Sequence, residues 1–221
     1  MRWGRAFVLI ALVTLTWFTW RSKAVYPVRI FVTFLHEMGH AAGTLATGGK
    51  VLRITISPDT SGKCLRQGGW DIVVIPAGYL GSMLFGTLIL LAASRTRFRK
   101  ATSFLLGLVF LACVTFYVRS MFDFFFGLAW GVALASAGWW LPEDANDLLL
   151  SYLGTASCLF AVFDLRDLWR LGSAADTDAG HFSEKILPLP PRVWAALWAA
   201  VAVVWALAAL RAAVRSSRSS R

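Results

Sequence analysis

The chain has 221 residues, of which 57% are hydrophobic and 15% are charged, and its formal net charge is +10. Soluble domains carry about a quarter of their residues as charged side chains, so this composition excludes an ordinary soluble protein. It predicts a chain whose solvent is largely lipid, and we therefore do not interpret the basic excess as a sign of nucleic-acid binding.

The apolar runs predict an all-α membrane protein, a polytopic bundle of about six or seven transmembrane helices in the cell membrane. A bilayer core of about 30 Å needs roughly 20 apolar residues per helix. Most runs reach or approach that length; they cover residues 7–20, 72–93, 102–118, 121–140, 148–163 and 193–210. We expect one domain (1–221) with an N-terminal span at 1–24, a motif-bearing helix at 25–47, a hairpin at 50–68, central spans at 71–165, a polar segment at 166–192, and a last span with a basic tail at 193–221.

The first apolar run could be mistaken for a secretory signal, because basic residues precede it. Trp17, Phe18 and Trp20 leave no small-residue cleavage site, so we interpret the run as a retained span. Basic residues beside other runs, at 95–100 and 211–221, predict that those segments face the cytoplasm.

The next segment, FVTFLHEMGHAAG at residues 31–43, places ionisable side chains in an apolar helix. His36 and His40 are one helical turn apart, a spacing that lets two imidazoles reach one zinc ion. Glu37 can then take a proton from a zinc-bound water as a general base. The alternative is that the three side chains satisfy one another as polar contacts. Ionisable groups within membrane segments are costly and by default functional, which favours the metal site.

Residues 50–57 and 63–68 are predicted to form a β-hairpin after this helix. The first segment is rich in β-branched residues, and Pro58 to Gly62 has the composition of a turn. Such a hairpin could pair with an extended peptide as an added strand, or it could be a plain connector.

A catalytic zinc site needs a third protein ligand and an open position for water. His181 is the only histidine outside the motif, and it lies in the polar segment. Among the acids we rank Asp164 first, because it ends a long apolar run, followed by Asp178, Asp123 and Asp167.

Four segments in this order resemble the M50 metallopeptidases of the site-2 protease clan, and within them the M50B-like family. The segments are FLHEMGHAAGTLATGG, VLRITISPDTSGKCLRQGG, PAGYLGSMLFG, and FDLRDL followed by DTDA. The resemblance implies a zinc-dependent membrane-embedded peptidase in which His36 and His40 bind zinc and Glu37 is the base. Site-2 proteases take their third ligand from an LDG motif. This chain has none, and Phe163-Asp164-Leu165 is its nearest match in position.

Site-2 proteases also carry an asparagine in a segment placed like PAGYLGS, and the resemblance implies that a residue of this segment holds the substrate backbone. In this chain Ser82 is the only small polar residue of the segment. The leading hypothesis is an intramembrane metalloprotease that cleaves a membrane-anchored protein. The alternatives are a membrane metal-binding protein for transport or sensing, and a membrane scaffold whose motif is incidental.

Overall fold

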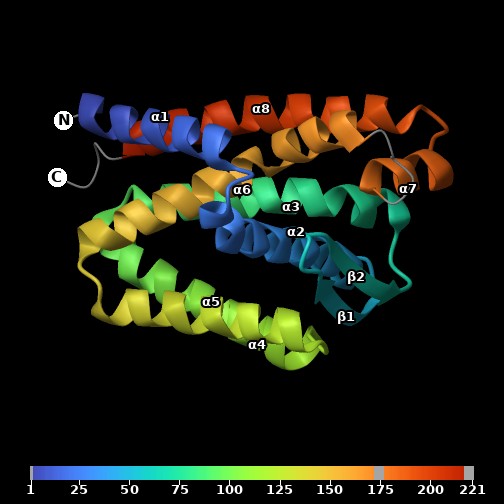
Figure 1. The fold of residues 1–221 in the computed structure, drawn as a ribbon, viewed down its shortest axis with the longest axis horizontal. Helices are drawn as coiled ribbons and strands as arrows, with labels where there is room; N and C mark the ends of the chain where they lie inside the picture. The colour runs from blue at the N-terminus through green and yellow to red at the C-terminus, as the bar shows by residue number, and fades with distance from the viewer. Residues whose placement is uncertain (1, 172–176, 217–221) are drawn as a thin grey trace.

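The computed structural model describes residues 2–171 and 177–216, and Figure 1 shows their arrangement. Its α-helices and strands are α1 (Arg2–Thr19), α2 (Tyr26–Ala46), β1 (Lys50–Ile56), β2 (Gly62–Gln67), α3 (Asp71–Ala93), α4 (Arg99–Tyr117), α5 (Met121–Trp140), α6 (Glu143–Leu171), α7 (Asp178–Lys185) and α8 (Pro191–Ser216). The predicted helical membrane bundle with a hairpin inserted after the motif helix is confirmed.

Within the described residues, the helices α3, α4, α5 and α8 are long and apolar enough to cross a membrane. The helices α1 and α2 also pass this test as a pair, but a bend of 116° separates them, so the part of the chain that the structure describes has four candidate spans, or up to five. This is fewer than the six or seven predicted. One reason is that two apolar segments of the sequence form, at most, a single broken span.

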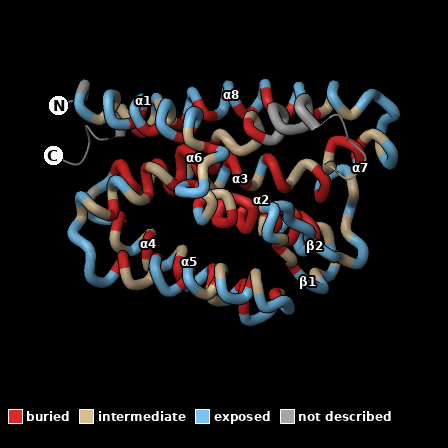
Figure 2. Tube along the Cα trace, viewed as in Figure 1, coloured by how far each residue is buried: buried red, intermediate tan, exposed pale blue. Residues whose placement is uncertain are grey.

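The most enclosed helix of the bundle is α2. Fourteen of its 21 residues are buried, against six of 19 in α4, and the buried stretch lies at the centre of the molecule in Figure 2. Phe31 and Phe34, which are fully buried, contact Phe110 of α4 at ring distances of 5.1 and 5.6 Å. The motif helix is therefore surrounded by protein over most of its length.

The hairpin lies along α2 and is fixed by hydrogen bonds to it. The Thr33 hydroxyl donates to the carbonyl of Thr60 at 3.0 Å, and the Tyr26 hydroxyl donates to that of Pro58 at 2.6 Å. Strand β1 also forms an isolated parallel bridge between Ile54 and Val118, which follows α4. The turn and one strand of the hairpin are therefore both held against helices.

The end of the bundle away from the hairpin is tied together by a buried charge network, and the start of α1 and the C-terminal part of α8 lie at this end in Figure 1. Asp147 of α6 accepts hydrogen bonds from Arg5 of α1 at 2.8 Å and from Arg99 of α4 at 2.9 Å. Both arginine side chains are about one-tenth exposed. One carboxylate thus joins three helices.

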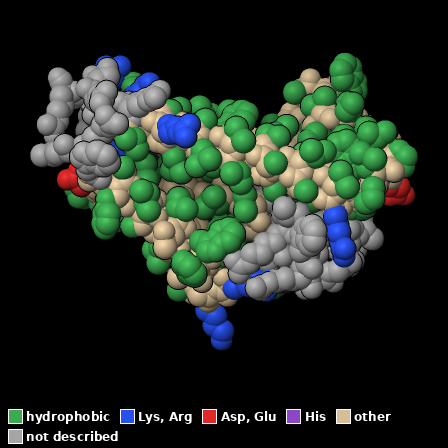
Figure 3. Space-filling view, turned by 90° about the horizontal axis from the view of Figure 1, so that it is seen from above, with side chains coloured by type: hydrophobic (Ala, Val, Ile, Leu, Met, Phe, Trp, Pro, Cys, Tyr) green, Lys and Arg blue, Asp and Glu red, His purple; other side chains and the backbone are tan. Residues whose placement is uncertain are grey.

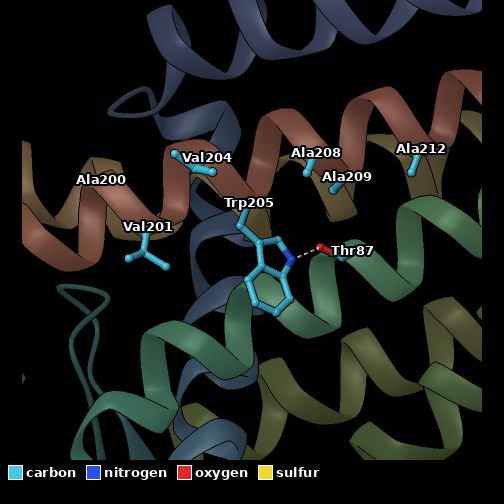
Figure 4. Close-up of a pocket in the computed structure, with 8 residues that line it drawn as sticks. All are labelled: Thr87, Ala200, Val201, Val204, Trp205, Ala208, Ala209 and Ala212. Carbon is cyan, nitrogen blue, oxygen red and sulfur yellow. Dashed lines mark hydrogen bonds between the residues drawn. The ribbon is translucent and has the colours of Figure 1, made fainter.

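Seen from above in Figure 3, hydrophobic side chains are spread over the described part of this face, and few charged side chains lie among them. An apolar groove of about 680 Å³ lies between α3 and α8. Trp205 of α8 reaches across this groove, and its indole N–H donates to the Thr87 hydroxyl of α3 at 2.8 Å (Figure 4). A surface with so many exposed apolar side chains is typical of a protein that lies in a lipid bilayer.

Candidate metal centre

Helix α2 brings its two histidines together on one buried face. The Nε2 atoms of His36 and His40 lie 3.1 Å apart, and each residue is 8% exposed. The Val74 carbonyl, in the first turns of α3, lies 2.8 Å from His40 Nδ1. A proton on Nδ1 that is donated to this carbonyl leaves the Nε2 lone pair of His40 directed at His36.

The third member of the cluster is Asp178, the first residue of α7. Its Oδ2 atom lies 3.0 Å from His36 Nε2 and 3.1 Å from His40 Nε2. Thr177 caps the helix, since its side chain accepts a hydrogen bond from the backbone N–H of Gly180. Burial alone would raise the pKa of the Asp178 carboxyl, but the histidines, chiefly His40, hold that pKa below its ordinary value. The carboxyl is therefore held in its charged form.

The three side chains form a group that could hold a metal ion. One ligand atom from each of His36, His40 and Asp178 lies within 4.8 Å of the others. Two imidazole nitrogens and a carboxylate oxygen are a common ligand set for divalent transition metals. The donor types and their convergence both fit a metal centre.

Helix α7 is held in place by aromatic packing against α8. The Phe182 ring contacts those of Trp194 and Trp198 at centroid distances of 4.6 and 5.5 Å. Trp198 also contacts Tyr79 of α3 at 5.2 Å, and Tyr79 contacts the His36 ring edge-on at 4.9 Å. A continuous set of rings thus joins the helix that carries Asp178 to the histidine it faces.

Helix α3 approaches the cluster closely because small residues line the contact. A Cβ atom at Gly78 would lie 2.5 Å from His40 Nε2 and 2.6 Å from His36 Nε2. One at Gly39 of α2 would lie 2.3 Å from the Ala77 carbonyl oxygen. The small residues around the motif therefore let the α3 backbone cover the two histidines.

Glu37 lies next to the cluster and beneath the hairpin. Its side chain is buried, and the backbone N–H of Cys64 in β2 donates to its carboxylate. A Cβ atom at Gly62 would lie 2.3 Å from Glu37 Oε1. The carboxylate therefore stands between α2 and β2, and it is not part of the three-residue group that could hold a metal.

The other acids considered from the sequence occupy different places. Asp164 lies in α6, but its side chain and that of Asp167 are outside those that the structure describes. Asp123 is fully buried at the start of α5, where it accepts a hydrogen bond from the backbone of Ile56. His181 is exposed on α7. Of the described candidates, Asp178 is the one beside the histidines.

Ser82, considered as a substrate-holding residue, is 1% exposed, and its hydroxyl donates to the Gly78 carbonyl one turn earlier at 2.9 Å. This hydroxyl is thus engaged within its own helix. Sequence reasoning also missed Gly62 and Gly78, whose importance depends on what lies opposite them in space. The only signal in the sequence was that glycine, which has no side chain, occupies both positions.

Comparison of the chain with curated proteins finds no match, and comparison with solved structures also finds none. A model of one protein family, described as Peptidase M50B-like, matches residues 8–209. This match covers most of the chain and includes every residue of the cluster, and it agrees with the resemblance seen in the sequence motifs. The chain therefore belongs to the Peptidase M50B-like family.

Proposed function

We propose that this protein is a zinc-dependent intramembrane protease that hydrolyses a peptide bond of a membrane-anchored protein in the cell membrane. The observation that carries the proposal is the convergence of His36, His40 and Asp178 beside the buried Glu37, in a bundle whose helices α3, α4, α5 and α8 are able to cross a membrane. Membership of a peptidase family supports hydrolysis over the other chemistries of such a site.

The ligand distances support zinc. The ligand atoms lie 3.0–3.1 Å apart, close to the edge, about 3.3 Å, of a tetrahedron with zinc–nitrogen bonds of about 2.0–2.1 Å. His36, His40 and Asp178 would be the three protein ligands, which leaves the fourth position for water or substrate. This choice favours Asp178 over Asp164, the first candidate from the sequence, because the Asp178 carboxylate lies within 3.1 Å of both histidines.

Bound zinc would polarise the scissile carbonyl and lower the pKa of a water molecule to near neutrality. Glu37 would accept a proton from the attacking water and would deliver it to the nitrogen of the leaving amine. Its burial shields this proton from bulk solvent, and the N–H of Cys64 orients the carboxylate. His40 is fixed for its role by the Val74 carbonyl.

The hairpin is well placed to align a substrate. The outer edge of β1 is engaged by Val118 and Asp123, and the outer edge of β2 is engaged at Gly62 and Cys64 by Glu37. An extended peptide that adds beside β2 would therefore displace these contacts and lie against the catalytic carboxylate. A plain connector would not need a strand pressed against the general base.

A non-proteolytic metal-binding protein is the main alternative. A metal store or sensor has no use for a buried glutamate that lies beside the ligands without belonging to their group. The position of Glu37 therefore favours the hydrolase.

The test is zinc content and cleavage of a quenched fluorescent apolar peptide, measured on the detergent-purified full-length chain. Glu37→Gln should retain zinc and lower the cleavage rate about 10²–10⁴-fold, because it removes only the base. His36→Ala and Asp178→Ala should lose zinc, and Asp164→Ala is the matched control that should keep it.

Three outcomes would contradict the proposal. Cleavage by the Glu37→Gln variant at the wild-type rate would refute the role of Glu37. Loss of zinc in Asp164→Ala, with retention in Asp178→Ala, would return the third ligand to α6. Zinc bound by a wild type that cleaves no peptide would favour the metal-binding alternative.

A further inference from the structure

Asp123 is a buried carboxylate with no part in the metal cluster. It is 0% exposed, it lies in the first turn of α5, and no cation of the described residues forms an ion pair with it. Its Oδ2 atom accepts a hydrogen bond from the Ile56 N–H at 3.2 Å, and its Oδ1 atom accepts one from the Ser120 hydroxyl. Burial of an unpaired carboxylate is costly, so its presence calls for a reason.

The hairpin's hydrogen-bond pattern links Asp123 to Glu37. Ser57 N–H donates to the Ser61 carbonyl at 2.8 Å, so the next pair, Ile56 and Gly62, does not bond across the hairpin. The backbone groups of both residues therefore point outward. On the β1 side the Ile56 N–H meets Asp123.

On the β2 side, the side chain that lies against this cross-strand pair is that of Glu37, the proposed general base. Gly62 lies directly against the Glu37 carboxylate, and the backbone of Cys64, two residues further along the strand, donates to it. Asp123 and Glu37 thus hold the two outer edges of one hairpin at the same level. A shift of β1 away from Asp123 would be carried across to β2 and to Glu37.

We propose that Asp123 is a positioning residue for catalysis, which fixes the hairpin through Ile56 so that β2 sets the place of Glu37. This inference rests on the proposed function and deepens it. The ordinary role of an acid at this point in a helix is a capping box, in which it bonds the backbone N–H of the cap residue. Asp123 instead bonds the Ser120 side chain and a strand 67 residues away in sequence.

The experiment compares Asp123→Ala and Asp123→Asn with wild type in detergent-purified full-length protein. Asp123→Ala should retain zinc and lower kcat for the quenched apolar peptide about 10²-fold, the cost of a misplacement of about 1 Å. KM should change less than kcat. Asp123→Asn should restore most of the rate, because its amide keeps an acceptor for the Ile56 N–H. Asp59→Ala is the matched control, since Asp59 is an exposed acid in the turn of the same hairpin and bonds only Ser61 in the described contacts.

A second readout is independent of cleavage: hydrogen exchange at the Ile56 amide, which should be faster in Asp123→Ala and close to wild type in Asp123→Asn. Wild-type kcat and unchanged Ile56 exchange in a folded Asp123→Ala variant would overturn the inference. If the wild type cleaves nothing, the proposed function fails, and unchanged exchange in Asp123→Asn and Asp123→Ala would overturn the positioning role as well. A fall in kcat that is matched by loss of zinc would also overturn it, because the defect would then lie at the metal ligands.

Discussion

A side chain at position 78 would collide with His36 and His40, the proposed metal ligands. The Cβ atom would lie 2.5–2.6 Å from both histidine Nε2 atoms, so either the imidazole rings or the α3 backbone would have to move. We therefore expect Gly78→Ala to lower zinc affinity by about 10–100-fold, the range seen when groups that support metal ligands are changed. Zinc retained after dialysis against a graded series of chelator concentrations measures this affinity.

Gly86→Ala is the control for the effect of a methyl group on the same helix. A Cβ atom there would lie 2.8 Å from the Gly154 carbonyl oxygen, in the contact between α3 and α6. It should lower the thermal stability of the protein and leave zinc affinity unchanged. Equal zinc affinity in Gly78→Ala and wild type would contradict the placement of α3 over the histidines.

The two histidines of the cluster could be predicted from sequence, because their geometry depends on a single helical turn. The third member depends on which distant segment folds back onto that turn. Asp164 ranked first because it ends an apolar run, whereas Asp178 lies beyond that run in a polar segment. The local signal for Asp178 was Thr177, which caps a helix and so places the aspartate in the first turn of that helix.

Strand β2 leaves no room for a side chain at its first residue. A Cβ atom at Gly62 would lie 2.3 Å from Glu37 Oε1 and 2.7 Å from a methyl group of Thr33. Gly62→Ala should therefore displace the carboxylate and lower the cleavage rate at least about tenfold, while the metal ligands remain in place. Parallel measurements of cleavage and of zinc content check this expectation.

Lys63→Ala is the control on the same strand, because Lys63 is exposed and pairs with Thr55. It should cleave as wild type does. A Gly62→Ala protein that also cleaves normally would show that the hairpin does not set the position of Glu37.

The hairpin itself was predictable, with strands expected at 50–57 and 63–68 and found at Lys50–Ile56 and Gly62–Gln67. Alternation of β-branched residues and turn chemistry are local properties of the chain. The contacts that the hairpin edges make were not predictable, because the hydrogen bond from Ile56 to Asp123 joins residues that are 67 positions apart.

At the scale of the whole molecule, the charge network of Asp147 should contribute to stability and not to catalysis. Asp147→Ala would leave Arg5 and Arg99, both about nine-tenths buried, without their carboxylate. Removal of one partner from a buried ion pair costs about 3 kcal/mol, at the lower end of the measured range because Asp147 is a quarter exposed. Thermal unfolding should show the loss, and zinc content per folded protein should stay constant.

Asp144→Ala provides the matched control. Asp144 lies 3.6 Å from Arg99 but is fully exposed, so its loss should leave the thermal midpoint unchanged. An Asp147→Ala protein as stable as Asp144→Ala would mean that the three helices are held by apolar packing alone.

Composition was sufficient to predict a helical membrane protein, since the apolar content cannot be covered by polar side chains. The number of spans was not predictable, because the sequence does not show that α1 and α2 meet at a bend of 116°. The length of an apolar run indicates only whether that one helix is long enough to cross a membrane. The direction in which one helix leaves the next depends on packing across the bundle.

The separation of the cluster along the chain bears on how the protein is made. His36 and Asp178 are 142 positions apart. At a synthesis rate of about 5–20 residues per second, Asp178 is added roughly 7–28 s after His36. With Asp178 as the third ligand, a nascent chain that already displays HExxH in the membrane would hold an incomplete centre during this interval. For the proposed protease, late arrival of the aspartate would delay activity, so that neighbouring membrane proteins would not be cleaved while the chain is still being inserted.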